Sequence, residues 1–308
     1  MSFVLVVLLQ VSSAGAAGPT RSAGLTAAAQ ASVRPRECAP LPFRATSRTN
    51  ANVWDAARDP ERGRYCDLLA RGFAQLAFSP KLALETADAA DRCSPGHAAP
   101  AVLRGRAFAA VKAFDRAGIE MERARSIDSR SLEEPLTLRD WARTLARTGR
   151  TADALAAYRS LGPRLSLLPS LEERAKIFLE AAELALSLDA NAIDDALAFL
   201  GEARQLGVRE LRFRIGSELA LAMDRKGRTE EAMALAAEMS RDVHKFARPS
   251  ADDGPESVAA AALVLERTDL RQALLLWDQY VKAVGEGAPW IAHAERRMER
   301  LRKRGGPL

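Results

Sequence analysis

One phrase of helical sequence occurs twice in this chain and constrains its fold more than any other feature. Residues 138–158 read LRDWARTLARTGRTADALAAY, and residues 216–236 read GSELALAMDRKGRTEEAMALA. In each copy the apolar positions recur at i, i+3, i+4 and i+7, a Gly-Arg-Thr turn follows, and a second helix begins. Two copies of one helical hairpin predict a repeat array, because a single hairpin cannot bury its own apolar face.

Four further hairpins follow from a small residue that recurs in each predicted second helix. The small residue is an alanine, and another core residue follows four positions later. A small side chain there lets two helices approach closely, while the later residue fills the space between repeats. The pairs are Ala83 and Ala87, Ala117 and Met121, Ala154 and Tyr158, Ala196 and Leu200, Ala232 and Ala236, and Ala273 and Trp277. The sequence therefore predicts six hairpins within residues 61–285, the fourth opening on a capping box at Ser170.

This pattern resembles that of the tetratricopeptide repeat (TPR) family, W-x2-L-G-x2-Y followed by A-x3-F and a closing proline. In the third hairpin Trp141 and Ala142 stand at the Leu-Gly pair and Leu145 at the Tyr, and Gly105 supplies the family glycine in the second. The resemblance implies an all-α, right-handed solenoid of about six TPR-like hairpins. An alanine-rich helical bundle is the alternative fold.

Both ends of the chain differ in composition from the repeats. An apolar run at residues 3–9 precedes Ala14-Gly15-Ala16, which is typical of a cleaved signal peptide over residues 1–17, although no basic residue precedes the run. An apolar N-terminal segment that is not cleaved is the alternative. Residues 18–60 read as a flexible linker.

Residues 286–308 are predicted to form a basic capping helix and tail. Its apolar face would cover the last repeat, as a solenoid requires. The other face would carry basic residues that could touch anionic lipid or nucleic acid, although no aromatic residues are interleaved to stack on bases. These are Arg296, Arg297, Arg300, Arg302, Lys303 and Arg304.

One arginine stripe suggests a binding surface. Arg139, Arg143 and Arg147 lie at i, i+4 and i+8 beside the apolar face of the third hairpin's first helix. In TPR proteins the first helices line a concave groove that holds peptides, and the resemblance places Arg106, Arg214 and Arg225 in the same groove. Guanidinium groups there would hold carboxylates of an acidic peptide. A solvated polar face is the alternative interpretation.

Catalytic and metal-binding motifs are absent from the sequence. It contains no HExxH, GxGxxG, P-loop or GxSxG pattern, and its three histidines are far apart. We therefore predict no enzymatic activity, cofactor or metal ion.

The predicted function is that of an exported, non-catalytic scaffold or adaptor, periplasmic or secreted, that binds a protein or peptide. Binding to nucleic acid is disfavoured, and no transmembrane segment or oligomeric state is predicted. The alternative is a cytoplasmic basic TPR regulator acting near nucleic acid or an anionic membrane, which applies if the N-terminal signal is not functional.

The three cysteines suggest a disulfide within the first hairpin. Cys66 and Cys93 are nearly equidistant from the turn near Ser79, so an antiparallel hairpin would bring them level. We therefore expect a Cys66–Cys93 bond, with two buried thiols as the alternative. Cys38, in the linker, would remain free or pair between molecules. A disulfide fits an oxidising compartment.

Overall fold

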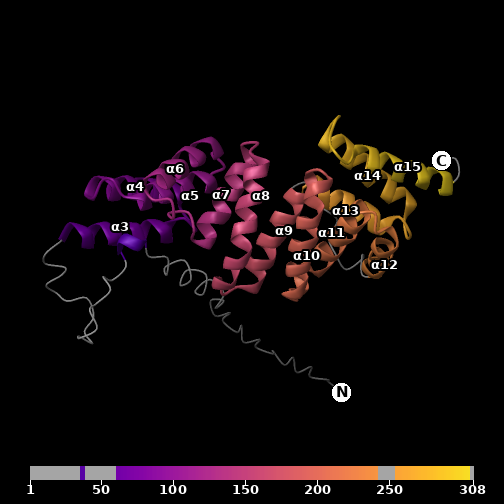
Figure 1. The fold of residues 1–308 in the computed structure, drawn as a ribbon, viewed down its shortest axis with the longest axis horizontal. Coiled ribbons are helices and arrows are strands. Elements are labelled where there is room, and N and C mark those ends of the chain that lie inside the picture. The colour runs from indigo at the N-terminus through magenta and orange to yellow at the C-terminus, as the bar shows by residue number, and fades with distance from the viewer. Residues whose placement is uncertain (1–34, 39–59, 242–253, 306–308) are drawn as a thin grey trace, which may run out of the picture.

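The computed structural model of the chain describes residues 35–38, 60–241 and 254–305. This part of the chain contains 13 α-helices and no strand, and their arrangement confirms the predicted helical-repeat solenoid. Consecutive helices pack into six hairpins that follow one another along the long axis of the molecule (Figure 1). The pairs are α3 (Pro60–Gln75) with α4 (Pro80–Cys93), α5 (Ala98–Ala110) with α6 (Phe114–Ile127), α7 (Pro135–Arg147) with α8 (Thr151–Leu161), α9 (Leu171–Ser187) with α10 (Ile193–Gln205), α11 (Arg212–Arg225) with α12 (Thr229–Ser240), and α13 (Pro255–Leu265) with α14 (Leu270–Val284).

The recurrent alanines lie at buried contacts between helices. All six are completely buried, and the residues four positions later are buried as well. The first helices contribute small residues to the same contacts: a Cβ on Gly105 would lie 2.6 Å from Met121 Cγ, and one on Gly216 would lie 2.3 Å from Met239 Sδ. The spacing pattern in the sequence is therefore a packing pattern between helices.

Overpacking one of these contacts should destabilise the array. We expect Ala154→Leu to lower the free energy of unfolding by about 1–3 kcal/mol, because the added methylenes have no space beside the partner helix. Ala156→Leu, on the exposed side of α8, is the matched control and should change stability much less. Equal urea midpoints for the two variants would contradict the repeat alignment.

The turns inside the second, third and fifth hairpins repeat one backbone geometry. Gly149 and Gly227 have positive φ angles of 80° and 86°, and in both turns the following amide donates to a carbonyl five residues earlier at 2.9 Å. This left-handed conformation strongly favours glycine. The second hairpin makes the same turn with Lys112 at φ 62°. The conformation places this lysine in the loop at the end of α5.

The disulfide of the structure differs from the predicted one. Cys66 is bonded to Cys38, with a Cα–Cα distance of 5.6 Å, and the predicted Cys66–Cys93 bond was wrong. The thiol of Cys93 instead contacts the Glu61 carboxylate at 3.0 Å. Glu61 precedes Cys66 by more than one turn of α3, so Cys93 is not level with Cys66. The prediction counted residues from a turn near Ser79. It was wrong because the end of α3 and the start of α4 lie at unequal distances from that residue.

Part of the predicted flexible linker is docked on α3. Residues Arg36–Cys38 form a 3₁₀ turn, and Arg62 Nη2 donates to the carbonyl of Glu37 at 2.7 Å. The Tyr65 hydroxyl donates to the Glu37 carboxylate at 2.9 Å, and burial together with this carboxylate raises the pKa of Tyr65. The prediction of a free or intermolecular Cys38 was therefore wrong. The predicted signal peptide and the rest of the linker lie outside the described residues.

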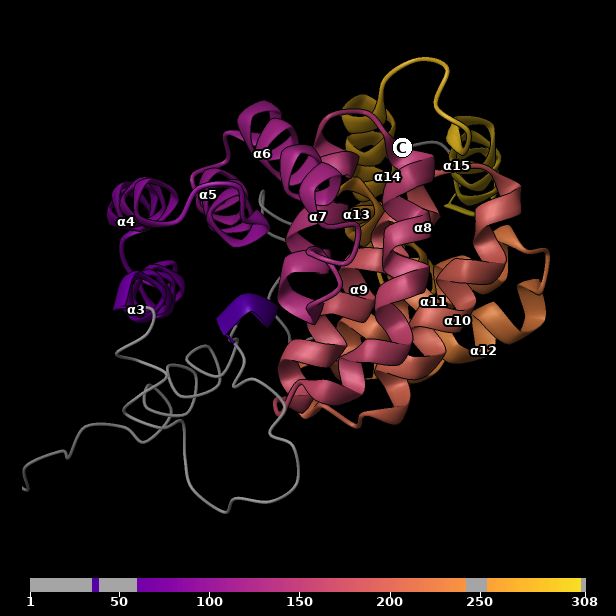
Figure 2. The same ribbon diagram turned by 60° about the vertical axis from the view of Figure 1, so that its left-hand side comes forward.

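The last helix, α15 (Ile291–Gly305), covers the end of the array as predicted and lies beside α14 (Figures 1 and 2). Its Ala294, Met298 and Leu301 are buried. No described helix is long and apolar enough to cross a bilayer.

The sequence pattern predicts that Arg297 lies on the solvent-exposed face of α15, but the structure buries it. Its side chain is only 5% exposed and forms an ion pair with Asp224 of α11. A second ion pair joins its Nη1 to Glu266, at the end of α13, at 3.0 Å. His293 Nε2 lies 2.8 Å from Asp224, and Trp277 Nε1 donates to Glu266 at 3.0 Å. A buried charge cluster therefore holds the capping helix.

Candidate functional site: the concave groove

A groove of about 870 Å³ runs along one side of the solenoid. Residues from the first helices α5, α7 and α9 line it, together with the turn after α3, residues of α6 and α8, the start of α13, the end of α14 and residues 288–290 before α15. Of the first helices, α3 and α11 contribute no residue to this lining. Among the predicted arginines, the lining contains Arg106, Arg139, Arg143 and Arg147.

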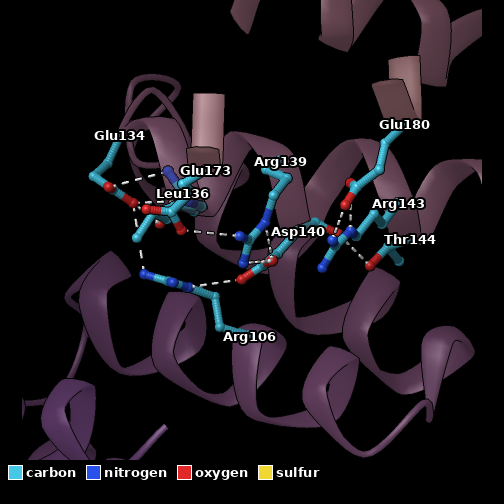
Figure 3. A network of polar contacts seen from close by, with 10 residues as sticks. Arg106, Glu134, Leu136, Arg139, Asp140, Arg143, Thr144, Glu173 and Glu180 are labelled. Atoms are coloured by element: carbon cyan, nitrogen blue, oxygen red, sulfur yellow. Dashed lines mark hydrogen bonds and ion pairs between the residues drawn. The ribbon is translucent and has the colours of Figure 1, made fainter. Parts of the chain in front are cut away.

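Two arginines of the groove lining converge on one buried carboxylate (Figure 3). Arg106 Nε lies 2.9 Å from one oxygen of Asp140, and Arg139 Nη2 lies 2.8 Å from the other. Burial alone would raise the pKa of Asp140, but these two guanidinium groups outweigh it and hold the pKa below its usual value. Asp140 therefore stays ionised and occupies both arginines.

Further ion pairs connect first helices of neighbouring hairpins. Arg143 of α7 forms a fork with Glu180 of α9, whose Nε–Oε2 distance is 2.7 Å, and Arg139 reaches Glu173 at 3.5 Å (Figure 3). The Glu180 carboxylate outweighs burial and raises the pKa of Arg143. Pairs this exposed contribute only about 0–1 kcal/mol each. Their main effect is to orient the side chains of the groove.

Arg214 lies behind the groove lining and contacts two glutamates. It pairs with Glu183, which lines the groove, and its Nε lies 3.1 Å from Glu218. Glu218 is completely buried and accepts from Ser257 Oγ at 3.0 Å. Burial, and next the charge of Glu183, raise the pKa of Glu218 well above its ordinary value. Arg214 therefore balances charge inside the chain.

Arg225 is also occupied inside the protein. Its side chain is completely buried, pairs with Glu256, and donates to the Leu186 carbonyl at 2.8 Å and to the Tyr280 hydroxyl at 3.0 Å. The guanidinium also lies 4.9 Å from the centre of the Trp290 ring, which is within cation–π range. Arg225 cannot reach a ligand in the groove without losing these contacts.

Arg147 alone among the six predicted arginines makes no ion pair or side-chain hydrogen bond with a described residue. It is exposed at the end of α7. Lys112 is likewise exposed in the lining without an ion pair to the described part of the chain, and sequence reasoning missed it because it lies in a turn outside the helical stripe. The two residues are called the free cation pair below. Ligand binding by Arg147 stays a prediction.

The groove as a whole is of mixed charge. Its lining contains five cationic side chains and the four carboxylates Asp140, Glu180, Glu183 and Glu256. The prediction of a basic groove counted arginines on one helix face and did not include carboxylates contributed by the next hairpin. A net preference for acidic ligands can come only from its unpaired cations.

No metal centre is formed by the described residues: they contain no group of three His, Cys, Asp or Glu side chains that could hold an ion. His97 packs against the ring of Tyr65, and His293 belongs to the charge cluster under α15. His244 lies outside the described residues.

Comparisons with known proteins show limited similarity. No family model matches the chain, and no curated protein matches it. One similar solved structure is described as Naa15/Naa10 bound to HypK-THB (TM-score 0.43, 15% identity); the match covers 78% of this chain and only 34% of that one. Another is an assembly chaperone of RpL4 (Acl4), with TM-score 0.45 and 15% identity, covering 79% and 99% of the two chains.

Proposed function

We propose that this chain is a non-catalytic scaffold or adaptor that binds a protein or peptide segment in its concave groove. The observation that carries the proposal is the groove itself, about 870 Å³ in volume and built from the first helices of successive hairpins. The ion pairs between its helices orient its side chains before a ligand arrives. A preorganised groove loses less conformational entropy on binding than a flexible one.

The ligand we propose is an acidic segment with an apolar residue beside its carboxylates. Lys112 and Arg147 are the lining cations without an ion pair to a described residue, and carboxylates of the segment would form charge-assisted hydrogen bonds with them. Leu76, Phe114 and Ala146 line the same groove and offer apolar contact. The paired arginines of the lining would shape the groove without attracting the charge of the ligand, because their own charges are already balanced.

The double variant Lys112→Gln/Arg147→Gln tests this assignment. We expect it to weaken binding of fluorescein-labelled acidic peptides by about three- to tenfold and to flatten the salt dependence, because exposed charge contacts are screened by salt. Arg204→Gln/Arg209→Gln removes the same charge from exposed sites outside the groove lining and should bind like the wild type. Equal affinity of the groove variant and the control would contradict the role of the free cation pair.

We further propose that the chain is exported. The Cys38–Cys66 disulfide is consistent with an oxidising compartment, and the apolar run at residues 3–9 is consistent with a leader. The mature protein from its native host is expected to begin near Gly18. Intact-mass spectrometry that found Met1 retained on a cytosolic protein would contradict export.

A further inference from the structure

The C-terminal end of the solenoid carries a second charged surface, away from the groove. A Cβ on Gly305, at the end of α15, would lie 4.0 Å from Leu270 Cδ1 at the start of α14, so these two helix ends are neighbours. Exposed arginines gather on them and on the loop before α14. They are Arg267, Arg271, Arg300, Arg302 and Arg304, and we call them the terminal arginine patch.

The charges of this patch are not balanced by ion pairs within the described part of the chain. None of the five arginines forms an ion pair with a described residue, and Arg300 donates only to the carbonyl of Arg296. The paired cation beside them is Lys303, which contacts Glu299 at 2.7 Å. In contrast, Arg297 on the same helix is buried and fully paired. The two faces of α15 therefore have different roles: one holds the helix on the solenoid, and the other presents positive charge to solvent.

The chemistry of the patch fits phosphate groups at a membrane surface. We propose that the terminal arginine patch docks the protein on a bilayer containing anionic phospholipids. Each basic side chain near such a surface strengthens binding by about fivefold. Leu275 lies one turn after Arg271 on α14, is 62% exposed, and is the kind of residue that inserts among headgroups.

Two features limit how the protein would sit on the bilayer. The apolar face of α15, formed by Ala294, Met298 and Leu301, is buried against the solenoid. The helix therefore cannot insert as an amphipathic anchor, and binding would be peripheral and sensitive to salt. A nucleic acid would use the same arginines, but the five arginines have no aromatic side chain among them on which bases could stack. The exposed leucine also has no role against a phosphate backbone.

Vesicle co-sedimentation of the full chain tests the proposal. Wild-type protein should bind vesicles of 30% phosphatidylglycerol in phosphatidylcholine at 50 mM NaCl, release in 500 mM NaCl, and ignore pure phosphatidylcholine. The triple variant Arg300→Gln/Arg302→Gln/Arg304→Gln should lose about a hundredfold in partitioning, from about fivefold for each arginine. The control Arg71→Gln/Arg204→Gln/Arg209→Gln removes equal charge from exposed sites on α3, α10 and the loop after α10, and should lose less than threefold.

Three results would overturn the proposal. The first is no binding to anionic vesicles at 50 mM NaCl. The second is an equal loss of vesicle binding in the control variant, which would mean that binding depends only on the net charge of the protein. The third is tighter binding to a labelled 20-base-pair duplex than to vesicles under the same conditions, which would assign the patch to a nucleic-acid backbone. None of these results depends on the concave groove, so the outcome is separate from that of the peptide-binding test.

Discussion

Replacing Arg297 by methionine is expected to lower the free energy of unfolding by about 3–5 kcal/mol. Methionine keeps much of the side-chain volume but leaves Asp224 and Glu266 without their cation. Both carboxylates are almost completely buried, with 2% and 3% of their side chains exposed. An uncompensated buried charge costs far more than the lost attraction of a surface pair, which explains the size of the expected effect.

The matched control for Arg297 is its neighbour Arg296, which is exposed on the same helix. Arg296→Met removes the same charge and should change the free energy of unfolding by about 0.5 kcal/mol or less. Urea unfolding followed by circular dichroism would compare the two. Similar midpoints for both variants would mean that the cluster under α15 does not hold the capping helix.

Loss of the Cys38–Cys66 bond is expected to lower the free energy of unfolding by about 3–4 kcal/mol. The bond joins residues 28 apart in sequence, so it restricts a loop of that length in the unfolded chain. Cys38→Ser should be made in a Cys93→Ser background, so that no new disulfide forms between Cys66 and Cys93. The single Cys93→Ser variant is the control and should remain close to the wild type.

Urea unfolding with and without reductant measures the contribution of the disulfide, and non-reducing peptide mapping confirms its partners. Reductant should shift the midpoint of the Cys93→Ser variant and leave the double variant unchanged. A midpoint of Cys93→Ser that does not respond to reductant would show that the bond does not stabilise the array.

The helical array could be predicted because its determinants are local in sequence. The buried alanine recurs in the second helix of every hairpin, and Gly149 and Gly227 stand at the same place in the third and fifth hairpins, so a single chain reveals them by comparison with itself. The capping box at Ser170 is also local, and its side chain accepts from the Glu173 amide at 3.2 Å as expected. Such features can be recognised from residues close in sequence, without knowing which distant segments pack against them.

The charges of the groove could not be predicted in the same way. Arg143 reads as a free groove residue until α9 brings Glu180 beside it, and Arg297 reads as a solvent residue until α11 brings Asp224. Both partners come from other hairpins, at separations that vary along the chain. The disulfide failed for a related reason, because Cys38 lies before the first helix and its docking depends on Tyr65 and Arg62.

The Cys38–Cys66 disulfide and the charge cluster under α15 lie at opposite ends of the array, and this placement affects how the array unfolds. In an array where each hairpin contacts mainly its neighbours, unfolding normally starts by fraying at a terminal repeat and then spreads inward. Here a disulfide raises the free-energy cost of unfolding the first helix by restricting its unfolded state, and a buried charge cluster holds the last helix on the array. Unfolding that starts at either end of the array therefore costs more free energy than simple fraying. The hairpins between the two ends should unfold together as one cooperative unit.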